Sequence, residues 1–420
     1  MPRFCYLSLV LLLLAILSAY VVFHAAQREE WEATQARGKL ALARLRGELA
    51  FARKDQLQQM QVFDDLPRVF VYEPLPSGCG ALPSLPEQAR NWDSLEAYLY
   101  SAFSTYAGRV SEPEEADFFF VPHAATLKYH GSSYNQSEAS CHFHQVLGSV
   151  AQHPYAARSA WADHIVPWAH DNFRNNLGDA GADLLPWALR HNAIFIVNQG
   201  DDGFVPAARF DLMVRDFSAH ATIVTLPPSW TAPQESVRSP WRERKYLAVF
   251  RGSLLPDLDY SNGVRQTLMA QFAQSPHPQI VFENHSPSYA AEMHQAKFCI
   301  FIKGWTVWSE RLGTLINAGC VPVIISDHYS LPFSRNLDWT TFSLRLSMAD
   351  AVVPGRLLSF LLNVSDERGM ELEANLTRIQ PSLQYNLPPV PGDIFDFILL
   401  ELTQRLRPHK PISGLNRWGR

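Results

Sequence analysis

The sequence predicts an α/β protein with two Rossmann-like domains that face a central cleft. Short, continuously apolar segments recur along the chain, and such segments are typical of strands buried on both faces of a parallel sheet. Segments with helical periodicity lie between them. The stretch 227–240 contains four prolines as well as serines and marks a boundary in the middle of this series. Each half is therefore expected to form its own sheet.

The boundaries follow from these signals. We expect a first domain at 66–228, a linker at 229–245, a second domain at 246–348 and a mainly helical tail at 349–420. The predicted strands of the first domain lie at 69–72, 118–121, 194–198 and 222–226. Those of the second domain lie at 247–250, 279–282, 298–302 and 321–325.

The segment 297–333 is the most informative part of the second domain. The strand at 298–302 ends at a Lys-Gly pair, and Ser309 is suited to cap the helix that follows. Leu312, Leu315 and Ile316 are spaced as one buried helical stripe. Gly319 suits the left-handed position after the last helical turn, before the strand at 321–325. This βαβ pattern predicts a ligand site beyond the carboxyl ends of the strands.

Several polar residues fall at that predicted edge of the second sheet. Arg311 lies in the first turn of its helix, where a cation opposes the helix dipole, and a bound phosphate would explain its presence. An arginine can also hold a diphosphate bidentately. The alternatives are an ordinary surface arginine at 311 and an inter-domain salt bridge at Arg251. The candidate residues of this ligand site are Arg251, Gly252, Lys303, Gly304, Ser309, Glu310, Arg311, Thr314 and Asp327.

The first domain offers candidates for the opposite side of the cleft. Asp201 and Asp202 follow a predicted strand, and one of them could act as a general base or, alternatively, serve only to cap a turn. His123, just beyond another strand end, is expected to face the cleft. The histidines near Cys141 lack a second cluster with zinc-like spacing, so we predict no metal site. The net charge of -5 leaves no basic footprint for nucleic acid.

Residues 4–23 are uncharged and long enough to span a bilayer. We expect a head at 1–3, an uncleaved transmembrane anchor at 4–23 and a helical stem at 24–65 that is suited to self-association; a cleaved signal peptide is the competing interpretation. The folded part would then lie in the lumen, where Asn135, Asn284, Asn363 and Asn375 are sequons.

The roles expected of the cysteines depend on where they lie in the predicted fold. Cys79 and Cys141 lie in predicted loops of the same half and could pair in an oxidising lumen. Cys299 and Cys320 lie in predicted buried strands, where we expect them to act as small core hydrophobes.

Several segments together resemble the exostosin-like glycosyltransferases. They are Arg68-Val-Phe-Val-Tyr72, the acidic and aromatic block 112–122, the strand and Asp-Asp-Gly loop at 192–203, the block 222–228, the strand Tyr-Leu-Ala-Val-Phe-Arg-Gly-Ser at 246–253, and the segment 297–333. These matches keep the family's order from about residue 68 to 345. The resemblance implies a GT-B type fold.

The resemblance also implies a function. A hexosyl or pentosyl unit would pass from a nucleotide sugar, UDP-linked in this family, to a glycan or polysaccharide acceptor with inversion and without a metal cofactor. The protein would be a single-pass type II protein of the Golgi membrane, alone or in an oligomer with a related transferase. Thr314 departs from the family, which usually has an acid there for the ribose; Glu310, one turn earlier, could replace it. This departure leaves open a non-catalytic partner of an active transferase.

Overall fold

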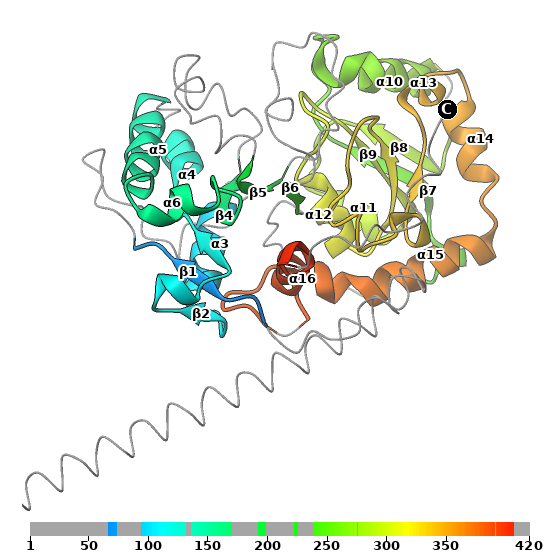
Figure 1. The fold of residues 1–420 in the computed structure, drawn as a ribbon. Coiled ribbons are helices and arrows are strands. Elements are labelled where there is room, and N and C mark those ends of the chain that lie inside the picture. Colours follow the sequence, from blue (N-terminus) through cyan, green and yellow to red (C-terminus); the bar gives the residue numbers. More distant parts are fainter. Residues whose placement is uncertain are drawn as a thin grey trace, which may run out of the picture.

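The computed structural model of the chain describes residues 66–73, 94–131, 136–169, 192–198, 222–225, 238–274, 276–390 and 392–406. The predicted anchor and stem, together with Cys79, Asn135, Asp201 and Asp202, lie outside these ranges. Within them the chain forms two parallel sheets, as predicted, each covered by helices (Figure 1). No helix in the described ranges combines the length and the apolar character needed to cross a membrane.

The first sheet has the strand order β2-β1-β3-β4-β5-β6 and is parallel throughout. Four of these strands confirm the sequence prediction. The other two, β2 and β4, were not predicted: β2 has only two residues, and a histidine and a proline interrupt the apolar run of β4. The bounds are β1 Val69–Val71, β2 Arg109–Val110, β3 Phe118–Phe120, β4 His164–Trp168, β5 Ile194–Val197 and β6 Thr222–Val224.

Helices bury both faces of this sheet. On one face, Leu99 and Phe103 of α3 pack against strand residues such as Phe120. On the other face, Phe143 and Leu147 of α5 lie in a cluster with alternate strand residues. The helices are α3 Leu95–Ser104, α4 Ala125–Gly131, α5 Gln136–Val150 and α6 Pro154–Arg158, with the 3-10 turn η2 Pro113–Glu115.

The second sheet has the order β11-β10-β9-β7-β8 and is also parallel. Its four long strands were predicted, whereas the two-residue edge strand β11 was not. The predicted stripe of Leu312, Leu315 and Ile316 is fully buried, and Gly319 has a φ of 62°, as expected. The bounds are β7 Tyr246–Arg251, β8 Ile280–Glu283, β9 Ala296–Ile302, β10 Val321–Ile325 and β11 Leu344–Arg345.

The helices of the second half again form two layers. α10 and α14 contribute Val264, Leu268, Leu357 and Leu361 to one face, whereas α12 and α16 lie over the other. The long helix α15 contributes Leu372 to the first face and Leu376 and Ile379 to the second. The bounds are α10 Val264–Gln274, α11 Tyr289–His294, α12 Arg311–Asn317, α13 Met348–Ala351, α14 Arg356–Leu362, α15 Asp366–Ile379 and α16 Ile394–Leu406, with 3-10 turns η4 Trp241–Glu243, η5 Tyr260–Gly263, η6 Trp339–Thr341 and η7 Gln380–Leu383.

The last helix, α16, connects the two halves (Figure 1). Its Phe395 makes edge-on contacts with Phe103 and Tyr106, with ring centroids 5.0 and 5.8 Å away. Just before it, the Tyr385 hydroxyl hydrogen-bonds Thr225 at the end of β6, 2.8 Å away. On the other side, Phe397 of α16 stacks on Phe333 of the second domain at 5.0 Å, so the tail packs on both domains.

One buried and one half-buried carboxyl group lie at this junction, those of Asp393 and Asp396. Asp393 accepts backbone hydrogen bonds from Val390 and Phe395, and Asp396 accepts one from Gly392. Neither forms an ion pair with a cation of the described residues. Burial raises the pKa of Asp393 to about 7 and that of Asp396 to about 6. Both carboxyl groups therefore hold their protons to a higher pH than they would in water.

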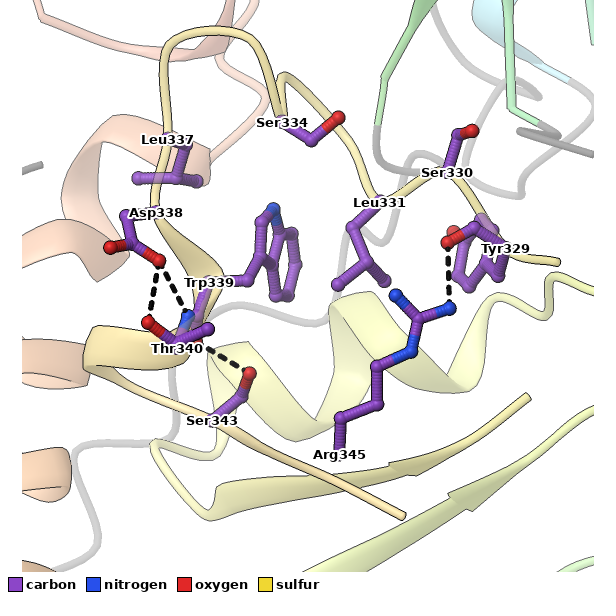
Figure 2. A pocket seen from close by; sticks show the side chains of 10 residues that line it. All are labelled: Tyr329, Ser330, Leu331, Ser334, Leu337, Asp338, Trp339, Thr340, Ser343 and Arg345. Atoms are coloured by element: carbon purple, nitrogen blue, oxygen red, sulfur yellow. Dashed lines mark hydrogen bonds between the residues drawn. The ribbon is translucent and has the colours of Figure 1, made fainter. Parts of the chain in front are cut away.

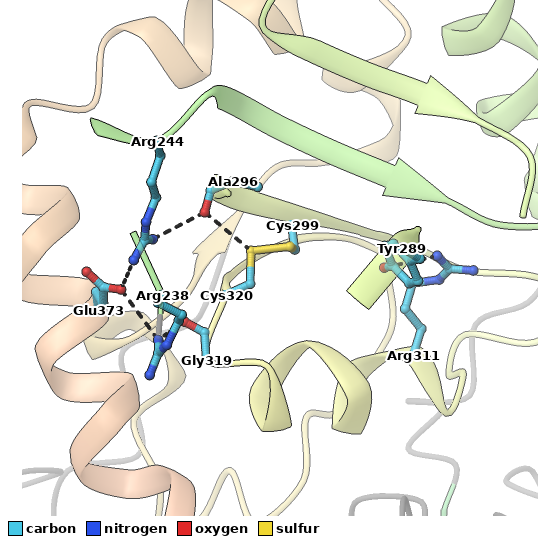
Figure 3. The surroundings of a disulfide bond; sticks show 9 residues. All are labelled: Arg238, Arg244, Tyr289, Ala296, Cys299, Arg311, Gly319, Cys320 and Glu373. Atoms are coloured by element: carbon cyan, nitrogen blue, oxygen red, sulfur yellow. Dashed lines mark hydrogen bonds and ion pairs between the residues drawn. A yellow bond between two sulfur atoms is a disulfide. The ribbon is translucent and has the colours of Figure 1, made fainter. Parts of the chain in front are cut away.

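The cysteines of the second sheet correct the sequence prediction. Cys299 in β9 and Cys320 just before β10 form a disulfide, with Cα atoms 5.7 Å apart (Figure 3). They pair because adjacent parallel strands bring them side by side, which the sequence spacing of 21 residues does not reveal. Cys141 is also disulfide-bonded, to a partner outside the described residues. Its predicted pairing with Cys79 stays a prediction.

Candidate functional site

The second sheet has a switch point between its neighbouring strands β7 and β9. The helix that follows β7, α10, packs on one face of the sheet, and the helix that follows β9, α12, packs on the other. The two chain connections therefore diverge at the carboxyl ends of these strands. In open α/β sheets this divergence forms the ligand crevice.

Arg311, the first residue of α12, lies at this switch point. Its guanidinium carbon is 4.9 Å from the centre of the Phe250 ring at the end of β7, and one amino group donates to the Tyr289 hydroxyl at 3.3 Å. Arg311 is only 9% exposed. Its Nε has no hydrogen-bond partner, and no carboxylate of the described residues pairs with it. A buried cation in this state is costly unless an anion joins it.

Gly252 makes this position of Arg311 possible. It follows β7, and a Cβ atom there would lie 2.8 Å from the guanidinium carbon of Arg311, and closer still to its Nη2. The arginine therefore passes directly over the backbone at Gly252, where no other residue leaves room.

A second arginine, Arg265, was not predicted. It lies in the first turn of α10, just as Arg311 does in α12, and it is 2% exposed. It donates to the carbonyl of Ser253 at 3.0 Å and to that of Ile302 at 2.6 Å, while its Nε lacks a partner. Burial, together with the nearby charge of Arg311, lowers the pKa of Arg265 to about 10. The sequence did carry a signal for Arg265: like Arg311, it lies in the first turn of a helix that follows a predicted strand.

Lys303, at the end of β9, is a third buried cation at this edge. Its ammonium donates to the Asn262 side chain at 2.9 Å. Asn262 lies in the turn before α10, where Ser261, Asn262 and Gly263 have φ values of 58°, 53° and 73°. This left-handed turn is held by a hydrogen bond from the Ser261 amide to the Gly304 carbonyl at 2.9 Å. The strained turn brings the loop after β7 against the loop after β9.

Arg251, which was predicted to bind the ligand or to form an inter-domain salt bridge, pairs with two carboxylates of its own domain. Its guanidinium pairs with Glu292 of α11 at 2.6 Å and with Glu283 at the end of β8 at 2.5 Å. These carboxylates raise its pKa. Both partners belong to the second sheet domain, so the pairing is not the inter-domain bridge considered above. With two carboxylates in place, Arg251 is less available to a diphosphate than Arg311.

The other predicted donor residues lie around the start of α12. Ser309 accepts the backbone amide of Arg311 at 3.4 Å, although the helix cap is Glu310, one residue later than predicted. Glu310 is exposed, and half-buried Thr314 bonds the Glu310 carbonyl at 3.4 Å. Asp327 accepts the backbone amide of Met348 at 3.1 Å and thereby fixes the start of α13.

His123 does not face an open cleft, which corrects the sequence prediction. It follows β3 as expected, but its Nε2 is 2.7 Å from the Pro167 carbonyl and its Nδ1 is 3.5 Å from Glu96. Phe143 and Trp168 pack against the ring. Glu96, fully buried in α3, also accepts the backbone amides of Thr126 and Ala169. The pair joins the ends of β3 and β4 inside the first domain.

The described sequons differ in exposure. Asn284 and Asn363 are exposed. Asn375 is 7% exposed within α15, and its side-chain nitrogen donates to the Thr341 carbonyl at 2.9 Å. Because this nitrogen is already bonded inside the fold, Asn375 is a less accessible glycan acceptor than Asn284 and Asn363. Among the described residues, no group of three or more His, Cys, Asp or Glu side chains is suited to hold a metal.

The model of the Exostosin GT47 domain matches residues 64–361, a range that contains both sheets and the cation cluster. The chain belongs to this family. It is thus a GT47 glycosyltransferase.

Several curated relatives match most of the chain at 26–28% identity. A probable glucuronosyltransferase of Oryza sativa is 28% identical over 74% of this chain and 72% of its own length. In Arabidopsis thaliana, the probable glucuronoxylan glucuronosyltransferase IRX7 is 26% identical over 85% and 81%, and the probable beta-1,4-xylosyltransferase IRX10L is 27% identical over 82% and 82%. The Anabaena protein HepE in complex with UDP-glucose aligns with TM-score 0.37 and 9% identity over 81% of this chain and 99% of that chain, a likeness too distant to bear on fold or ligand.

Proposed function

We propose that this GT47 glycosyltransferase binds a nucleotide sugar at the carboxyl edge of its second sheet and transfers the sugar to a polysaccharide acceptor. The observation that carries the proposal is the pair Arg265 and Arg311, both buried, close enough to affect each other's charge and without a carboxylate partner in the described part of the chain. A diphosphate would supply the missing negative charge and accept their unused N–H groups.

The same pair suggests how the reaction proceeds. When the bond from sugar to diphosphate breaks, negative charge grows on the leaving group. Fixed guanidinium groups in a dry site stabilise this charge without reorganising. Transfer is then a direct displacement with inversion in a GT-B type arrangement, and a metal ion is not required. A carboxylate of the first domain, Asp201 or Asp202, is our candidate for the base that takes the acceptor proton.

The names of the relatives support a choice of substrates. We propose a UDP-linked glucuronosyl or xylosyl donor and a polysaccharide acceptor. The first sheet has its own switch point between β1 and β3, because β1 lies beside β3 while the chain passes through β2 at the edge. The acceptor is expected to approach that edge.

The disulfides support a location. Cys299–Cys320 and bonded Cys141 are typical of an oxidising compartment. With the predicted anchor at 4–23, we propose a single-pass type II protein of the Golgi membrane whose folded part is lumenal. Protease treatment of sealed and opened vesicles tests this orientation, and a mature N-terminus at or after residue 24 would contradict the anchor.

A donor titration tests the function. Arg311→Ala is expected to lower turnover about 10²–10³-fold, as for other groups that stabilise charge in the transition state. Arg311→Lys keeps the charge without the fork geometry, so its turnover should lie between those of the parent and Arg311→Ala. Arg356→Ala, which removes an exposed arginine of α14, is the control. A folded Arg311→Ala protein that binds UDP-glucuronate and UDP-xylose as the parent does would refute the site.

A further inference from the structure

A separate pocket of about 340 Å³ opens in the loop between β10 and β11 (Figure 2). It shares no lining residue with the cluster of Arg265, Lys303 and Arg311. Leu331, Leu337 and Trp339 give it an apolar wall, and hydroxyl groups, one carboxylate and one guanidinium line the rest. Its volume lies in the range of small-ligand sites.

The pocket is built by fixed side chains. Trp339 donates from its ring nitrogen to the Pro332 carbonyl at 2.7 Å, and Ser343 donates to the Trp339 carbonyl at 2.7 Å. Arg368 of α15 donates to the Thr340 carbonyl at 2.9 Å. These bonds hold the loop against the body of the domain, so a ligand would find the pocket preformed.

The charges of the pocket are kept apart. Asp338 and Arg345 come from opposite sides of it (Figure 2). The Asp338 carboxylate accepts the amide and hydroxyl of Thr340, at 3.0 and 2.7 Å. Arg345 donates from one amino group to the carbonyls of Ser326 and Tyr329, both at 3.2 Å, and forms no ion pair with a carboxylate of the described residues. Its guanidinium is thus oriented by the backbone, and because Arg345 is exposed, its charge is open to a ligand that arrives from solvent.

We propose that this pocket holds an acidic sugar unit, a hexuronate, of the acceptor chain at a distance from the transfer site. The carboxylate of the sugar would pair with Arg345, and its hydroxyls would exchange hydrogen bonds with Ser330, Ser334 and Asp338. A single cation beside a carboxylate suits one carboxylate group better than a diphosphate. The inference rests on the proposed polysaccharide acceptor.

Binding of two matched oligosaccharides to the full chain in detergent, without donor, tests the proposal. The probes are xylohexaose and the same hexaose with one glucuronic acid branch, measured by isothermal titration calorimetry. We expect the acidic probe to bind more tightly, and Arg345→Gln to weaken it about tenfold or more while leaving the neutral probe unchanged. Ser334→Trp, which fills the exposed mouth of the pocket, should weaken both.

Arg356→Gln is the matched control, because it removes an exposed arginine of the same domain outside the pocket. Equal affinity for the two probes, or unchanged binding of the acidic probe by Arg345→Gln, would overturn the subsite. Loss of UDP-sugar binding in Arg345→Gln would also overturn it, since the pocket would then belong to the donor site. Loss of donor binding in Arg311→Ala alone bears only on the proposed function, so the two failures are distinguishable.

Discussion

Replacing Gly252 with alanine should disable Arg311 without touching it. The new methyl would lie 2.8 Å from the guanidinium carbon, whereas relaxed contacts of this kind need about 3.5–4.0 Å. The Arg311 side chain is flexible, so its guanidinium must move away from the new methyl by roughly 1 Å. A misplacement of this size in a group that contacts the reacting centre can cost about 10²-fold in rate.

The fold itself should change little. Displacing Arg311 from the Phe250 face loses a cation–π contact worth about 0.5–2 kcal/mol. Alanine also reduces the conformational freedom of the unfolded chain, which stabilises the fold by about 0.4–1 kcal/mol. This gain applies because the backbone at Gly252 does not need a left-handed conformation. The melting temperature should therefore fall by only a few degrees.

The assay is a double-mutant cycle of Gly252→Ala and Arg311→Ala, read by donor affinity, turnover and thermal melting. Because both changes remove the same contact, we expect the double variant to be about as impaired as Arg311→Ala alone. Gly148→Ala, which places a methyl in open space on α5, is the control. Fully additive losses, or a Gly252→Ala enzyme with parental turnover, would show that Arg311 does not act from the position described.

Four further outcomes are expected. Replacing Cys299 and Cys320 together by alanine should lower the free energy of unfolding by about 3 kcal/mol, measured by urea denaturation, and equal stability would contradict a structural disulfide. Asn375→Gln should leave the glycosidase-induced mass shift unchanged, whereas loss of a glycan would show that α15 forms after modification. Burial raises the pKa of Asp393 to about 7, above its unfolded value, so its contribution to the free energy of unfolding is fully present at low pH and is lost as the pH rises from about 4 through 7. Asp393→Asn should therefore flatten the decline in the free energy of unfolding over this pH range. An unchanged pH profile of unfolding would refute this expectation. Transfer should persist in excess EDTA, and a complete loss restored by Mn²⁺ would assign a metal to the reaction.

Much of the second domain could be predicted from local patterns. The strand at 298–302, the helix with Leu312, Leu315 and Ile316 on its buried side, and the left-handed Gly319 all follow from periodicity and turn chemistry within about twenty residues. The same local reasoning placed Arg311 at the carboxyl edge of the sheet. Short pieces such as β2 and β11 carry too few residues to show a period, so they could not be found this way.

The state of each side chain was decided by partners distant in sequence. Arg251 is paired because Glu292, 41 residues later, reaches it from α11, whereas Arg311 is left without an acid. His123 is buried because Glu96 and the end of β4 close over it.

By itself, then, the sequence determined the two parallel sheets, the carboxyl edge at which Arg311 lies and the motifs that place the chain in its family, because strand and turn preferences act between near neighbours. Only the tertiary structure decided that Arg265 joins Arg311, that Cys299 bonds Cys320 and that α16 ties the second domain to the first. Each of these depends on which surfaces meet when the sheets are covered, and such contacts leave no periodic trace in the chain.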